Sequence, residues 1–278
     1  MKGQAGGKLI LCGEHAVVHG HPAIAIPVAL HTTVTVEPSS GPLQVDHELW
    51  GARHEDRLYE ALETLFPDGG HAITIESELP VGVGLGSSAA LSVAVARAMG
   101  LESDADVSAA AMKMEQVFHG DPSGLDVAVA MRGETVWFVK GKPIRTVQTP
   151  PCAIVAMDSG SSGNTAEMVQ KVKDGGPKSQ ETIADIGALV HAARAVLGDP
   201  ESLGELLNEN MTYLRKLGLS TPTLDQLVAM AMGAGAYGAK LSGAGGGGVV
   251  LALIDDPAPL VASCERAGFD AWTVRGPE

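Results

Sequence analysis

The sequence predicts an α+β protein with two lobes. Strand-like runs dominate the start of the chain, helical and strand-like patterns mix in its second half, and Pro150 and Pro151 interrupt the chain between them. We therefore expect an N-terminal domain over residues 1–149 and a C-terminal domain over residues 150–278. A cleft between two such lobes is the natural place for a ligand.

The expected elements of the first half are strands followed by helices. Apolar runs predict strands at Lys8–Cys12, Ala23–Ala29, Thr32–Glu37 and His71–Glu78, and a helical pattern covers Glu55–Phe66. Further helices are expected over Leu91–Met99 and Ser103–Phe118, the second with Asp104 and Asp106 as acids of its first turn. A third helix is expected to have Asp121 as its N-cap and Pro122 in its first turn, and to end at Gly133. Short strands at Thr135–Val139 and Ile144–Val147 complete this half.

The second half alternates differently. A strand at Cys152–Met157 precedes helical patterns at Thr165–Lys173, Gln180–Leu197, Leu203–Leu217 and Thr223–Ala234. Strands at Ala239–Ser242 and Val249–Ile254, a helix at Pro259–Ala267 and a strand at Ala271–Val274 follow.

Composition limits the classes of function. The formal net charge of −14 argues against nucleic acid or an anionic membrane as a partner, because both bind basic surfaces. The three cysteines lie in apolar runs and suit reduced core residues of a cytoplasmic protein. The N-terminus does not have a signal-peptide pattern, and no run approaches the roughly 18 apolar residues of a membrane span.

The most informative segment is Pro80-Val-Gly-Val-Gly-Leu-Gly-Ser-Ser-Ala-Ala90, which leads directly into a helical pattern. Glycines let a backbone approach an anion, and the first amides of a helix attract negative charge. A phosphate-binding loop and a plain helix-entry turn both remain open from this segment alone. No Gly-Lys-Ser/Thr occurs in the chain, which excludes a Walker A loop, and the second helix that follows argues against a dinucleotide fingerprint at Gly84–Ala89.

Three other clusters contain candidate functional residues. The glycine-rich segment Gly243–Gly248 joins two expected strands. It is either a second loop that binds an anion or a flexible hairpin connection. Near the N-terminus, an apolar strand begins at Lys8 and is followed by Glu14 and His15. Two interpretations of Glu14 and His15 remain open: they bind a ligand, or they cap a turn.

Two carboxylates complete the set. Asp126 lies in an otherwise apolar helix, where a buried carboxylate needs a cation, whereas Glu115 alone is typical of a solvated helix face. Glycine loops, a lysine, a serine and two carboxylates are the parts of a magnesium-dependent phosphoryl transfer, with Ser88 and Glu115 as oxygen ligands and Asp126 as the base.

These segments resemble the GHMP kinase superfamily and, within it, the mevalonate kinase family. The resemblance rests on Gly7–Gly20, Pro80–Ala90, Lys240–Gly248 and the segment His119-Gly-Asp-Pro-Ser-Gly-Leu-Asp126, in that family's order. It implies an N-terminal lobe like ribosomal protein S5 domain 2, a ferredoxin-like C-terminal lobe and a homodimer.

The resemblance also implies roles for individual residues. Asp126 is the catalytic base with Lys8 beside it, Ser88 and Glu115 hold Mg²⁺, and Glu14, His15 and Thr165 face mevalonate. The ATP phosphates are bound by Gly82, Gly84, Leu85, Gly86, Ser87, Ser88, Ala89, Gly243, Ala244 and Gly245.

One departure bears on the acceptor. Mevalonate kinases often have Arg-Asn-Thr where this chain has Gly163-Asn164-Thr165, so a positive charge for the substrate carboxylate must come from elsewhere. The expected reaction is phosphorylation of the 5-hydroxyl of (R)-mevalonate by ATP. The alternatives are another small alcohol or a phosphorylated isoprenoid precursor as acceptor, or a nucleotide-binding protein without catalysis.

Overall fold

Two long strands near the N-terminus, β1 (Lys2–Cys12) and β2 (Ala23–Pro38), run through both parts of the fold. The computed structural model describes residues 1–47 and 52–275. It divides into a first unit, formed by Met1–Lys8, Pro27–Val81 and Leu85–Gly133, and a second unit, formed by Leu9–Ile26, Gly82–Gly84 and the chain from Glu134 onward. The expected domain boundary at residues 149 and 150 stays a prediction.

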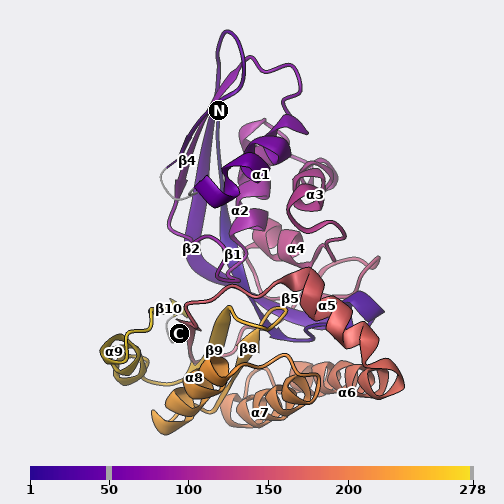
Figure 1. Ribbon diagram of the computed structural model, residues 1–278, viewed down its shortest axis with the longest axis vertical. Helices are drawn as coiled ribbons and strands as arrows, with labels where there is room; N and C mark the ends of the chain where they lie inside the picture. The colour runs from indigo at the N-terminus through magenta and orange to yellow at the C-terminus, as the bar shows by residue number, and fades with distance from the viewer. Residues whose placement is uncertain (48–51, 276–278) are drawn as a thin grey trace. The chain divides into compact units, whose positions relative to one another are not determined.

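The first unit is a sheet covered on one face by helices (Figure 1). The strand order of this sheet is β3-β4-β2-β5-β6, with β1 also paired to β2, and its last two strands belong to the second unit. Strands β2 and β4 are antiparallel from Thr32–Ser77 to Pro38–His71. The remaining elements of the first unit are β3 (Gln44–His47), α1 (Ala52–Glu63), β4 (His71–Ser77), α2 (Ser87–Ala98), α3 (Asp104–His119) and α4 (Leu125–Arg132).

Small side chains explain how the helices pack. Helix α2 has the sequence SSAALSVAVARA and is almost entirely buried, so α3 and α4 can approach its backbone closely. The hydroxyl of Ser103 caps α3 by accepting a hydrogen bond from the amide of Asp106, which confirms the predicted start of this helix. This packing brings the polar residues of α2 and α3 next to each other.

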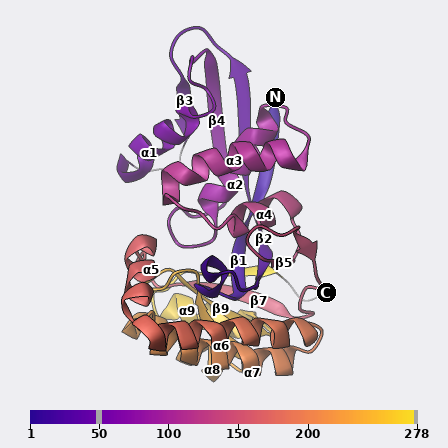
Figure 2. The same ribbon diagram turned by 90° about the vertical axis from the view of Figure 1, so that its right-hand side faces the viewer.

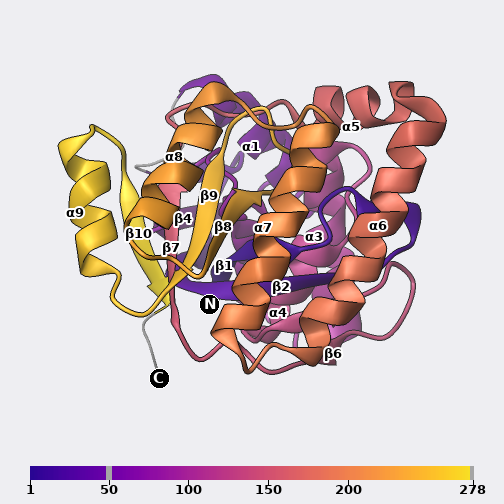
Figure 3. The same cartoon turned by 90° about the horizontal axis from the view of Figure 1, so that it is seen from below.

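The second unit contains an antiparallel sheet with strand order β10-β7-β9-β8. Helices α7 and α8 pack against it, and α6 lies beside α7 (Figures 2 and 3). Its elements are the 3-10 helix η1 (Ala16–His19), β5 (Val136–Phe138), β6 (Arg145–Thr146), β7 (Ala153–Asp158), α5 (Thr165–Asp174), α6 (Gly176–Ala195), α7 (Pro200–Lys216), α8 (Pro222–Gly233), β8 (Gly238–Ser242), β9 (Val249–Ile254), α9 (Ala258–Arg266) and β10 (Ala271–Arg275).

The α+β class is confirmed, and several elements differ locally from the prediction. The two strands predicted over residues 23–29 and 32–37 form one strand, β2, and the short strand β3 was not predicted. The third helix starts later than predicted, because Gly124 adopts a left-handed conformation and becomes its N-cap. Asp121 and Pro122 therefore lie outside α4, while Gly133 ends it as predicted.

The cysteine prediction is also confirmed, since Cys12, Cys152 and Cys264 are buried and unpaired. Within residues 1–47 and 52–275, no helix has the length and apolar character needed to cross a membrane.

Candidate active site

The first glycine loop ends at the N-terminus of α2. Gly82, Gly84 and Gly86 have φ values of +81°, +95° and +77°, a region that favours glycine. Gly86 is the N-cap of α2, and a Cβ there would lie 2.9 Å from Cγ of Lys8. The amide of Lys8 donates a hydrogen bond of 2.8 Å to the carbonyl of Leu85. The end of the loop is thus held against β1, with the first amides of α2 free of side-chain caps.

Lys8 and Asp126 form an ion pair beside this helix start. Lys8 Nζ lies 3.2 Å from Asp126 Oδ2, and the two side chains are 6% and 31% exposed. Asp126 is in the first turn of α4, so its carboxylate reaches the surface while Val127 and Val129 turn into the core. The sequence interpretation of Asp126 as a buried group was wrong, but the expected cationic partner is present.

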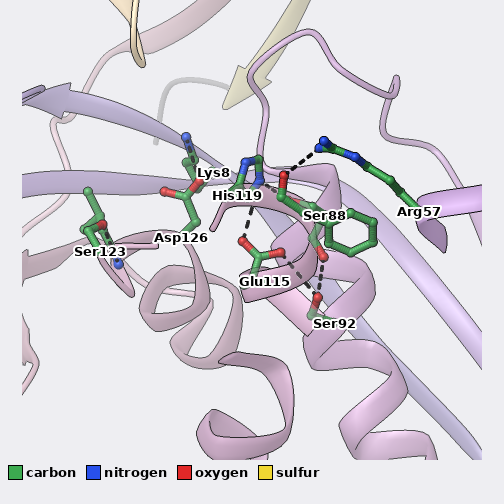
Figure 4. A network of polar contacts seen from close by, with 10 residues as sticks. Lys8, Arg57, Ser88, Ser92, Glu115, His119, Ser123 and Asp126 are labelled. Carbon is green, nitrogen blue, oxygen red and sulfur yellow. Dashed lines mark hydrogen bonds and ion pairs between the residues drawn. The ribbon is translucent and has the colours of Figure 1, made fainter. Parts of the chain in front are cut away.

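Glu115 on α3 is buried, with 2% exposure, contrary to the exposed face expected from its sequence context. Its Oε1 accepts a hydrogen bond of 3.3 Å from Ser92 on α2 (Figure 4). Burial, reinforced by repulsion from Asp126, raises the pKa of Glu115 to about 7, although Ser88, Ser92 and Lys8 lower it. Glu115 and Asp126 are thus close enough to interact, as the sequence predicted.

His119 completes this cluster and was not identified from the sequence as a site residue. Its Nε2 lies 3.0 Å from Ser88 Oγ and 3.8 Å from Glu115 Oε2. Burial lowers the pKa of His119, against the opposing charge of Asp126. The four-residue spacing between Glu115 and His119 places both on one face of α3, and that spacing was the available signal.

Ser88 and Glu115 suit a magnesium ion. Both residues offer hard oxygen atoms. The Glu115 carboxylate is buried, and its neighbour His119, whose pKa is lowered, does not provide it with a permanent positive charge. In the described parts of the chain, no group of three or more His, Cys, Asp or Glu side chains is placed to hold a metal ion. A cation at Ser88 and Glu115 would therefore take its other ligands from phosphate and water, as Mg²⁺ often does.

In the second unit, Glu14 and Lys240 form a buried ion pair. Glu14 is 1% exposed and Lys240 is fully buried, and Asn210 donates a hydrogen bond of 3.4 Å to the second carboxylate oxygen of Glu14. Lys240 also donates to the carbonyl of Leu241 at 2.6 Å. Lys240 therefore stabilises the interior of this unit and does not extend toward a ligand.

His15 connects the N-terminal segment to the second glycine loop. It has a φ of +58°, and its Nε2 lies 2.9 Å from the carbonyl oxygen of Ala244. Burial lowers the pKa of His15. Ser242 adds a second connection, because its hydroxyl accepts from the amide of Ile10 and donates to the carbonyl of the same residue.

The glycines of the second loop permit close backbone contacts. A Cβ on Gly247, whose φ is +148°, would lie 2.5 Å from the carbonyl oxygen of Ser161. A Cβ on Gly163 would collide with the carbonyl oxygen of Gly245. A side chain at position 163 would therefore require this loop to shift. Thr165 is exposed at the first turn of α5, which Asn164 caps.

Comparison with known proteins points to one family. The GHMP kinases N terminal domain matches residues 56–134, and the GHMP kinases C terminal domain matches residues 188–267. The mevalonate kinase of Thermococcus sibiricus is 36% identical, covering 92% of this chain and 90% of that protein. The mevalonate kinase of Methanothermobacter thermautotrophicus is 35% identical, covering 97% and 96%. The crystal structure of L. major mevalonate kinase in complex with R-mevalonate aligns with a TM-score of 0.86 and 28% identity over 96% of this chain and 91% of that chain.

Proposed function

Because the chain belongs to the mevalonate kinases, within the GHMP kinases, we propose that it transfers the γ-phosphoryl group of ATP to the 5-hydroxyl of (R)-mevalonate. Its fold is the GHMP kinase fold, and it is a kinase. One observation in the first unit supports the reaction most directly. The Lys8–Asp126 ion pair lies beside the cluster of Ser88, Glu115 and His119. The proposed base, Asp126, is therefore near the oxygen atoms of Ser88 and Glu115, which are suited to bind a cation.

Asp126 is the proposed base. As the substrate oxygen bonds to the γ-phosphorus, the bond from that phosphorus to the bridging oxygen of ADP breaks, and the hydroxyl proton goes to the Asp126 carboxylate. The ion pair with Lys8 orients this carboxylate, and its partial exposure leaves it accessible to a hydroxyl group. Lys8 also places a positive charge near the reacting oxygen.

Ser88 and Glu115 are the proposed ligands of Mg²⁺. When bound, this cation neutralises negative charge on the phosphate groups. The remaining phosphate contacts are assigned to the two glycine loops, in which positive φ values suit close approach to an anion, and to the first amides of α2, which have no side-chain cap. His119 touches both Ser88 and Glu115, and it must turn away for them to bind a common cation.

His15 and Thr165 are proposed to face the acceptor. Glu14 is proposed to act with them through its ion pair with Lys240, which fixes the backbone that presents His15. The proposal also includes a homodimer, from the family resemblance, and a cytoplasmic location, which agrees with three buried and unpaired cysteines.

Release of ADP in the presence of Mg²⁺ and mevalonate tests this proposal. Wild type and Asp126→Asn are compared between about pH 6 and pH 9, with Asp104→Asn as the matched control. Asp104 forms an exposed ion pair with Arg132 in the same unit, at 2.8 Å. We expect activity in wild type and the control only. No ADP release from folded wild-type protein would contradict the proposal.

A second acceptor class is favoured by one observation, the glycine at position 163 in place of an arginine. The alternative acceptors are small alcohols without a carboxylate and phosphorylated isoprenoid precursors. A panel of hydroxy acids, sugars, amino acids and phosphomevalonate separates them by kcat/KM. Phosphorylation of another compound at a higher kcat/KM than mevalonate would replace the acceptor and keep the kinase chemistry.

A further inference from the structure

We propose that Arg57 on α1 binds the phosphate groups of the nucleotide at the start of α2. This inference rests on the proposed function and adds a residue that lies outside the motifs. Arg57 Nη1 donates a hydrogen bond of 3.1 Å to the carbonyl oxygen of Phe118. The next residue is His119, whose Nε2 lies 3.0 Å from Ser88 Oγ. Figure 4 shows the Arg57 side chain extended toward Ser88 and His119.

The contact with Phe118 orients Arg57 without neutralising it. A backbone carbonyl accepts one N–H of the guanidinium, and several N–H groups stay available for another acceptor. The side chain is exposed, so a soluble anion has access to it. After burial and the charge of Lys8, the charge of Arg57 is a further cause that lowers the pKa of His119, which agrees with a short distance between them.

Two other exposed arginines have carboxylate partners. Arg132 pairs with Asp104 at 2.8 Å, and Arg215 pairs with Asp225 at 2.7 Å. Within residues 1–47 and 52–275, no carboxylate lies within ion-pair distance of Arg57. Among the described residues, the Arg57 guanidinium is therefore available to an anion other than a protein carboxylate.

The charge requirement of the site supports the same assignment. The phosphates of ATP need positive charge beyond that of one divalent cation. Lys8 already pairs with Asp126, so its charge is shared with the base. Arg57 supplies a positive charge next to Ser88, and its planar fork matches two phosphate oxygens at once.

Calorimetric titration with MgATP, MgADP and AMP tests the inference. The variants are Arg57→Ala, Arg57→Lys and the control Arg132→Ala, which removes an exposed arginine of the same unit that pairs with Asp104. We expect Arg57→Ala to weaken MgATP binding by about tenfold to a hundredfold, the range of one charge-assisted contact. AMP binding should change much less, and Arg57→Lys should recover part of the loss. The control should bind MgATP like wild type.

The outcomes separate the inference from the proposed function. Unchanged MgATP affinity in Arg57→Ala, or an equal loss for MgATP and AMP, would overturn the inference while the kinase assignment stands. Wild-type protein that binds no nucleotide would overturn the kinase assignment and the inference together. Thermal unfolding and circular dichroism of each variant identify a misfolded sample, and Arg57→Gln then replaces Arg57→Ala in the same titration.

Discussion

The buried Glu14–Lys240 pair allows a quantitative test of how the second unit is stabilised. In the variant Lys240→Met, the apolar stem of the side chain keeps its packing and the ammonium group is lost. Glu14 is then left with Asn210 as its hydrogen-bond partner, at 3.4 Å, in a site where the carboxylate is 1% exposed. The free energy of unfolding should fall sharply.

The magnitude follows from the burial of both groups. Removing one member of a buried ion pair typically costs about 3–5 kcal/mol, because the remaining charge lacks both water and a partner. That loss is a large part of the roughly 5–15 kcal/mol by which a typical protein is stable. The double variant Glu14→Gln/Lys240→Met has no charge in the site, and a glutamine can still accept the hydrogen bond from Asn210. It should therefore be more stable than Lys240→Met alone.

Urea unfolding measures these differences. In a Trp50→Phe background, the fluorescence comes from Trp137 and Trp272, which both belong to the second unit. The control Lys173→Met changes an exposed lysine of α5, and its unfolding free energy should stay within about 0.5 kcal/mol of wild type. A loss below about 1 kcal/mol in Lys240→Met, or a double variant as unstable as the sum of the single variants, would refute the reasoning.

Three further predictions concern Asp126, Glu115 and Gly247. Asp126→Asn should lower kcat by at least about a hundredfold and leave MgATP affinity unchanged; equal loss of both would point to a structural role. The pKa of Glu115 is raised from 4.5 to about 7, so between pH 4.5 and pH 7 the folded state binds more protons than the unfolded state. The free energy of unfolding should therefore fall by about 3 kcal/mol as the pH rises through this range. Urea unfolding of Glu115→Gln should lack this slope, and an identical slope would exclude Glu115 as its cause. Gly247→Ala should raise the KM for ATP, because its Cβ would lie 2.5 Å from the carbonyl oxygen of Ser161, and an unchanged KM would show that the loop adapts.

Features set by neighbouring residues were predictable from the sequence. The glycine loops and the capped start of α3 follow from local backbone preferences, and the structure confirms each of them. The start of α4 was predicted wrongly from equally local signals. Asp121 and Pro122 are typical of a helix start, but the left-handed Gly124 delays the helix until Leu125, whose amide bonds to the hydroxyl of Ser123.

Several features that depend on distant residues were not predictable, although the nearness of Lys8, Glu115 and Asp126 was expected. Lys240 lies beside a glycine loop in the sequence, whereas its ion-pair partner Glu14 lies 226 positions away. Glu115 is buried because the small side chains of α2 let α3 pack closely, a fact that the pattern of α3 alone does not contain. Arg57 donates a hydrogen bond to the carbonyl of Phe118, the residue before His119, and no spacing in the sequence indicates that contact.

The glycine at position 163 fits the packing of the second glycine loop. Any side chain there would collide with the carbonyl of Gly245, and Gly245 itself packs tightly against Leu219, with a hypothetical Cβ 2.5 Å from its carbonyl oxygen. The glycine at 163 and the conformation of the second glycine loop therefore depend on each other. Placing an arginine at 163 would shift a loop assigned to ATP phosphates, so such a change should impair nucleotide binding before it improves recognition of a carboxylate. If mevalonate is the acceptor, its carboxylate must be bound by a group outside this segment, which makes cationic residues elsewhere in the site the first place to search.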